Sequence, residues 1–207
     1  LYHPSITRIR GIDWTMPAIV LAFALFLVNI IFYQPFVITG PDGKGEVAAI
    51  VFTNHILLAL TAALVYCIFR EVTGETKYSV FGTIAVISSS SFLFWASNAK
   101  DHILMVTCLA LVLLFFVRYI SHRRYTDAVI AFTASGLAAW ARLEIAFFVF
   151  AMCAFFFLFL QGRNVLQHAA PWKTVVMESS AILFVLPGAL PFFINNLVVT
   201  GDPFRPT

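Results

Sequence analysis

The sequence predicts an all-α protein: a polytopic transmembrane helix bundle of about seven spans that includes one hairpin with a short arm. Hydrophobic residues make up 61% of the 207 residues and charged residues only 11%, which excludes a soluble globular domain. The apolar residues lie in long runs that short polar stretches separate. Most runs approach the roughly 20 residues that a helix needs to cross the hydrocarbon, at about 1.5 Å per residue.

Each apolar run defines one expected span. The fifth run is the short one, with about 14 residues. In the seventh, Pro187 and Pro191 predict a kink, which a membrane helix tolerates where neighbouring groups satisfy the freed backbone. Neither end of the chain resembles a signal peptide or a closing tail, so residues 1–207 are expected to form a single transmembrane domain of a longer protein. In chain order, the runs are Trp14 to Tyr33, Val47 to Phe69, Ser79 to Ala96, Ile103 to Tyr119, Ala128 to Ala141, Ile145 to Leu160 and Val175 to Val199.

The segment from Thr126 to Gln161 is predicted to form two helices rather than one. A single helix of about 35 residues would be about 52 Å long, against a hydrocarbon core of about 30 Å. It would also place Arg142 and Glu144 near its middle. A hairpin that turns at these residues avoids both problems. Its first arm would be only about 21 Å long, so we expect the charged pair to lie below the outer interface and to face a wet cavity.

The basic residues set the expected orientation in the membrane. Of the 13 Lys and Arg residues, nine fall on one side of the predicted spans and four on the other. The positive-inside rule makes the first side cytoplasmic, together with the N-terminus, in an integral membrane protein that we expect in the plasma membrane of a prokaryote. We interpret the cluster from Arg118 to Arg124 as a topology anchor. The net charge of +3 is small and scattered over the loops, so no nucleic-acid partner is expected.

Most of the unpaired acidic and basic groups are predicted on the non-cytoplasmic side. Lys100, Asp101 and His102 lie side by side between two apolar runs. Ionisable groups are costly beside hydrocarbon and tend to persist where they face a polar cavity, a partner or a substrate. A solvated turn that caps two spans is the alternative, and the sequence leaves both open. The other candidates on this side are Asp42 and Glu46 in the first external loop, and Arg142 and Glu144.

Arg142 and Glu144 are two positions apart, so on a helix they would point to different sides and would not simply neutralise each other. Two structural explanations compete with a functional one. Arg142 would fit a snorkelling interface residue. Glu144 would cap the following helix, where a carboxylate near the N-terminus is favourable by about 0.3 to 1 kcal/mol.

The segment Ser135-Gly136-Leu137-Ala138-Ala139-Trp140-Ala141-Arg142-Leu143-Glu144 resembles an element of the C-type superfamily of integral membrane glycosyltransferases. In that superfamily, which includes protein O-mannosyltransferase-like and aminoarabinose transferase-like enzymes, a small-residue-rich helix closes with Arg-Pro-Glu or Lys-x-Glu. The span from Thr53 to Gly74 is similar to an early span of the family, and Ser97 to His102 occupies the place of an external loop that carries an Asp. The segment from Asn195 to Phe204 resembles a turn that follows a later span.

The resemblance covers roughly Val47 to the end, with two departures. Leu143 stands where the family usually has Pro. The first external loop, Gln34 to Val47, is short where the family usually has a long loop that bears an essential Asp. Asp42 or Glu46 fills that role, or the acid lies upstream of Leu1.

The resemblance implies transfer of a sugar from a polyprenyl-phosphate carrier to an acceptor on the non-cytoplasmic side. Asp101, Asp42 or Glu46 would be the catalytic carboxylate that positions or deprotonates the acceptor hydroxyl. Lys100 and Arg142 would stabilise charge on the departing phosphate. The further substrate-binding candidates are His102 and Glu144.

The sequence leaves the cofactor and the acceptor undecided. Asp101 with Glu46 would suit Mg²⁺ or Mn²⁺. The acceptor would be a protein, a lipid or a glycan. A transporter or channel subunit and a non-catalytic scaffolding subunit stay as alternatives. A transporter usually holds its charges near the midplane and often has inverted repeats, and this sequence shows neither.

Overall fold

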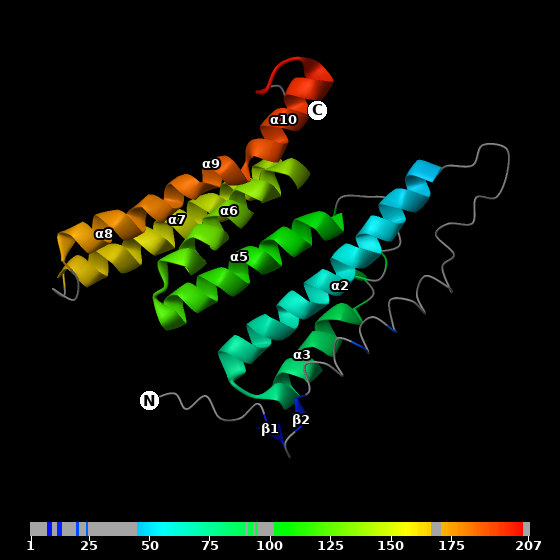
Figure 1. The fold of residues 1–207 in the computed structure, drawn as a ribbon, viewed down its shortest axis with the longest axis horizontal. Helices are drawn as coiled ribbons and strands as arrows, with labels where there is room; N and C mark the ends of the chain where they lie inside the picture. The colour runs from blue at the N-terminus through cyan, green and yellow to red at the C-terminus, as the bar shows by residue number, and fades with distance from the viewer. Residues whose placement is uncertain are drawn as a thin grey trace. The chain divides into compact units, whose positions relative to one another are not determined.

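The computed structural model describes residues 8–9, 12–13, 20, 24, 45–89, 91–92, 94, 102–166 and 171–204, with only the backbone described for 8–9, 12–13 and 45–49. The described chain is almost entirely helical, as predicted (Figure 1). The exception is a short antiparallel pair, β1 (Arg8–Ile9) with β2 (Ile12–Asp13), in which Arg8 lies opposite Asp13. The chain divides into two compact units, Leu1–Ile103 and Leu104–Thr207, and each is described by itself.

In the first unit, α2 (Gly45–Thr73) packs against α3 (Thr76–Ile87). Gly74 adopts a φ of 71° between the two helices, and its amide donates to the carbonyl of Arg70 at 3.0 Å. The helix α2 confirms the second predicted run. The third run extends to Ala96 in the prediction, but α3 has only 12 residues and ends at Ile87, with Ser88 as its C-cap. Residues 91, 92 and 94 are again helical.

The second unit contains α5 (His102–His122, whose first two residues belong to the first unit), α6 (Tyr125–Ala141) and α7 (Leu143–Leu166). The last apolar run follows as α8 (Trp172–Ser179), the 3₁₀ helix η1 (Ser180–Phe184), α9 (Val185–Gly188) and α10 (Leu190–Thr200). The short helix α6 is central, because it packs against α7, η1, α9 and α10. The interruption at Ala189 lies between Pro187 and Pro191, where a kink is predicted.

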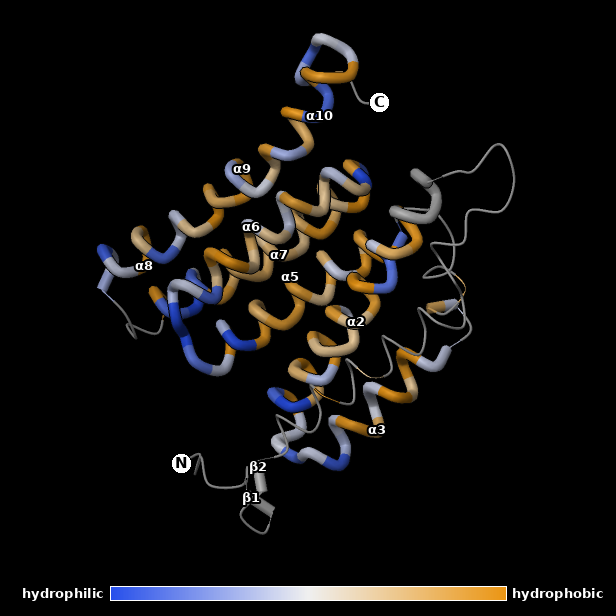
Figure 2. Tube along the Cα trace, turned by 45° about the vertical axis from the view of Figure 1, so that its right-hand side comes forward, coloured by the Kyte–Doolittle hydropathy of each residue, from blue (hydrophilic) through white to orange (hydrophobic). Residues whose placement is uncertain are grey.

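The predicted hairpin is confirmed. Arg142 has extended backbone angles of −153° and 110°, and it separates α6 from α7, which pack against each other. The core of the unit lies between α5, α6, α7 and η1, where Tyr119, Phe132 and Phe157 are fully buried. In Figure 2, hydrophobic residues follow the helix bodies of this unit and hydrophilic residues gather at the turn between α5 and α6.

Four described helical segments are long and apolar enough to cross a membrane: Ile50–Thr73, His102–His122, Leu143–Leu166 and Trp172–Thr200. They correspond to four of the seven predicted spans. The helices α3 and α6, with 12 and 17 residues, are shorter than these four segments. Of the run from Trp14 to Tyr33, the structure describes only Val20 and Ala24. The total of seven spans therefore stays a prediction.

Candidate functional site

The turn between α6 and α7 is built around Arg142. Its amide donates to the carbonyl of Ala138 at 3.0 Å, and its carbonyl accepts from the amide of Ala146 at 3.0 Å, so the residue ends one helix and begins the next. The Arg142 side chain is half-buried. Because the small side chains of Ala138, Ala139 and Ala146 pack in one cluster, the two helix ends approach closely here.

Glu144 lies in the first turn of α7 and is exposed. A carboxylate at this position interacts favourably with the unpaired amides and the dipole of a helix N-terminus, by about 0.3 to 1 kcal/mol. The structure therefore places Glu144 where the capping explanation expects it. On one continuous helix, the side chains of Arg142 and Glu144 would point to different sides. Arg142 is extended rather than helical, so the two residues do not share a continuous helix.

Two further elements, α5 and α10, begin near this turn. Met105 of α5 and Phe192 of α10 belong to the same cluster as Ala139 and Ala146. His102 is the first residue of α5, one helical turn before Met105, as predicted. We call this region, the α6–α7 turn with the beginnings of α5 and α10, the Arg142 end.

The described residues include only part of the predicted site. His102, Arg142 and Glu144 are described with their side chains, and Glu46 lies in the first turn of α2, where only the backbone is described. Asp42, Lys100 and Asp101 lie outside the described residues. Convergence of Lys100 and Asp101 with Arg142 therefore stays a prediction. Among the described residues, no group of three His, Cys, Asp or Glu is arranged to hold a metal ion.

The segment after α10 forms a defined turn. Gly201 adopts a φ of 76°, which favours glycine, and it ends the helix. The side chain of Asn196, buried in α10, donates to the carbonyl of Pro203 at 3.2 Å. The carboxylate of Asp202 accepts from the amide of Phe204 at 2.9 Å. The side chains of Asn196 and Asp202 thus stabilise the chain reversal.

Sequence reasoning missed a buried polar cluster at the opposite end of the unit. Tyr119 donates its hydroxyl to Glu178 Oε2 at 2.8 Å, and Gln161 Nε2 lies 2.6 Å from the same oxygen and 2.5 Å from the Tyr119 hydroxyl. Tyr119 and Gln161 are almost completely buried. The available signal was that polar residues close the fourth and the sixth apolar runs, at Tyr119 and directly after Leu160.

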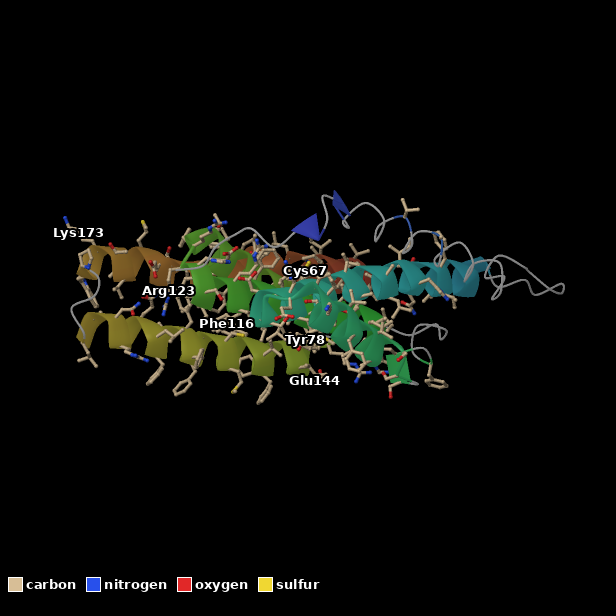
Figure 3. The ribbon with its side chains drawn as sticks, turned by 90° about the horizontal axis from the view of Figure 1, so that it is seen from below. Cys67, Tyr78, Phe116, Arg123, Glu144 and Lys173 are labelled. Carbon is tan, nitrogen blue, oxygen red and sulfur yellow. The ribbon has the colours of Figure 1, made fainter. Side chains whose placement is uncertain are left out.

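The cluster links three helices, α5, α7 and α8, near the α5–α6 turn. Arg123 lies in that turn with a φ of 55°, and its guanidinium carbon is 5.7 Å from the centre of the Tyr119 ring. We call this region the Arg123 end. Figure 3 shows Arg123 and Lys173 toward one end of the second unit and Glu144 toward the other. The two polar regions are therefore separated by the length of α6.

The model of the protein family described as dolichyl-phosphate-mannose-protein mannosyltransferase matches residues 42–190. The match extends from before α2 to the first residue of α10, and it includes Arg142 and Glu144. Neither the curated proteins nor the solved structures gave a match.

Proposed function

Because the chain belongs to the dolichyl-phosphate-mannose-protein mannosyltransferase family, we propose that it transfers a sugar from a polyprenyl-phosphate carrier to an acceptor on the non-cytoplasmic side of a prokaryotic plasma membrane. The observation that carries this proposal is the family match over residues 42–190 in a chain with four helices able to span a membrane. The superfamily resemblance noted in the sequence points to the same chemistry.

The Arg142 end supports this assignment because it combines a guanidinium, a group able to bind phosphate, with the start of α7, which is long and apolar enough to cross a membrane. A guanidinium can bind two phosphate oxygens at once, which a compact ammonium cannot do. Arg142 is half-buried, so its interaction with a phosphate would be less screened than that of an exposed side chain. We propose that Arg142 binds the phosphate of the donor, with Lys100 as a second cation.

We assign the acceptor side of the reaction to a carboxylate. Asp101 immediately precedes α5, whose beginning lies at the Arg142 end. A carboxylate there would position or deprotonate the acceptor hydroxyl, with Asp42 and Glu46 as the other candidates. His102 and Glu144 would complete the substrate site. Mg²⁺ or Mn²⁺ bound by Asp101 and Glu46 stays part of the proposal.

A transport function is the competing proposal, and the position of the charges favours the transferase. Transporters hold their ionisable groups near the midplane, at interrupted helices. In the second unit, the interruption between α9 and α10 involves Pro187, Ala189 and Pro191, none of which is ionisable. The charged pair Arg142 and Glu144 lies instead at a helix end.

The test is sugar transfer by the full-length protein in proteoliposomes. A radiolabelled mannosyl-phosphoryl-polyprenol should support transfer to an acceptor, and a nucleotide sugar should not. Arg142→Ala should abolish most of the transfer, and Arg163→Ala, at the far end of α7, should leave it unchanged. Transfer from the nucleotide sugar alone would overturn the donor assignment. Uptake of a solute without any transfer would favour the transport alternative.

A further inference from the structure

We propose that the Arg123 end of the second unit binds the headgroups of anionic phospholipids. The proposal concerns the end opposite Arg142 and does not depend on the transferase function. Four exposed cations lie there: Arg123 and Arg124 in the α5–α6 turn, Arg163 near the end of α7, and Lys173 at the start of α8. The sequence predicts all four on the cytoplasmic side and interprets the first two as part of a topology anchor, and the fold gathers the four at one end of the unit.

Hydrogen bonds show that the three segments belong to one end. Tyr119, four residues before Arg123, bonds with Gln161, which is two residues before Arg163. Tyr119 also donates to Glu178 of α8, the helix that carries Lys173. Cations from α7 and α8 are thus joined to the α5–α6 turn by contacts between buried side chains rather than by proximity in the sequence.

The four exposed cations at this end outnumber the described carboxylates beside them. Glu178 is half-buried and accepts hydrogen bonds from Tyr119 and Gln161 on Oε2, and Asp127 is only 6% exposed. The exposed charges at this end are therefore mainly positive. Clusters of four or more Lys and Arg beside a membrane helix attract anionic lipid. Each such residue near the surface strengthens the binding about fivefold.

Two local features place these cations at the level of the headgroups. Trp172 precedes Lys173 and is 68% exposed, and tryptophan concentrates at the boundary between hydrocarbon and water. Arg123 has left-handed backbone geometry, in which its amide donates to the carbonyl of Tyr119 at 2.8 Å and its guanidinium lies over the Tyr119 ring. The end of α5 therefore fixes the position of this side chain.

The experiment measures the association of spin-labelled lipids with the full-length protein in phosphatidylcholine bilayers. Spin-labelled phosphatidylglycerol should associate several-fold more strongly than spin-labelled phosphatidylcholine at low salt. The preference should fall toward one in 1 M salt, where the screening length is about 3 Å. It should also fall in a variant with Arg123→Gln, Arg124→Gln, Arg163→Gln and Lys173→Gln.

Two further variants keep the test decisive. If the fourfold variant does not fold, Arg124→Gln with Lys173→Gln should still lower the preference, because both side chains are exposed and neither packs in the core. Tyr78→Phe changes an exposed side chain of the first unit without changing any charge and should leave the preference unchanged. Equal association of both lipids with the natural protein, or an unchanged preference in the folded variants that lack cations of the Arg123 end, would overturn the proposal.

Discussion

Gly136 and Gly188 face each other across the contact between α6 and α9. A Cβ atom added at Gly136 would lie 2.1 Å from the carbonyl oxygen of Val185, and one added at Gly188 would lie 2.0 Å from the carbonyl oxygen of Thr133. Each glycine thus leaves room for the backbone of the other helix. Without a strong hydrophobic force between helices in lipid, such close backbone approach is a main source of helix association.

We predict that Gly136→Ala and Gly188→Ala each destabilise the second unit. The obstructing atoms belong to the backbone, so the helices must move apart, and overpacking of this kind costs about 1 to 3 kcal/mol or more. Gly162→Ala is the matched control in α7, because its Cβ would meet nothing within 4 Å. Thermal unfolding in detergent should show lower midpoints for the first two variants only. Equal midpoints for all three would contradict the contact.

We predict that Tyr119→Phe lowers stability by about 1 to 3 kcal/mol, because it removes the hydroxyl that bonds with Glu178 and Gln161 and leaves buried polar groups with fewer partners. The ring and its packing against Phe157, at 5.0 Å between centroids, would be kept. Tyr78→Phe is the control, since Tyr78 is 61% exposed. Unfolding by denaturant measures the difference, and a Tyr119→Phe protein as stable as the control would show that the cluster contributes little.

The sequence allowed the α6–α7 hairpin to be predicted because two independent constraints agree at Arg142. One helix would be too long for the bilayer, and it would carry charges at its middle. The interruption between α9 and α10 was also predictable, since Pro187 and Pro191 each remove a backbone donor. In both cases, the determining information lies within one short segment of the chain.

The polar cluster and the glycine contact could not be predicted in the same way. Tyr119 and Gln161 are separated by 42 residues, and Tyr119 and Glu178 by 59, so their meeting depends on how four helices pack. A buried glutamine looks like a loop residue when it directly follows an apolar run. In the same way, glycine and alanine in an apolar run resemble ordinary lipid-facing residues until the partner helix is known.

The topology of the hairpin gives a third prediction. In a protein whose three cysteines are replaced by alanine, Leu143→Cys and His122→Cys should lie on opposite sides of the membrane. The two positions flank α6 at its two ends, and both side chains are exposed. An impermeant thiol reagent added outside sealed cells should label Leu143→Cys, and it should label His122→Cys only after permeabilisation. Labelling of both positions from outside would refute the predicted orientation.

The roles proposed for Arg142 and Asp101 give a fourth prediction, which separates donor binding from turnover. Arg142→Ala should raise the KM for the lipid-linked sugar, because it removes the two hydrogen bonds that the guanidinium can donate to the phosphate. Arg142→Lys should recover only part of the loss. Asp101→Asn should lower kcat by about 10² to 10³ and leave the KM for the donor nearly unchanged, as expected for a charge that acts mainly in the transition state.

Glu144→Gln provides the comparison for these kinetic effects. Its carboxylate lies in the first turn of α7, where a purely capping role predicts a change in stability of about 0.3 to 1 kcal/mol and little change in either kinetic parameter. Steady-state transfer by full-length protein in proteoliposomes measures all four variants under one condition. If Asp101→Asn and Arg142→Ala both transfer at the natural rate, neither residue acts in the reaction. Asp42 and Glu46 would then be the remaining candidates for the carboxylate that positions or deprotonates the acceptor hydroxyl.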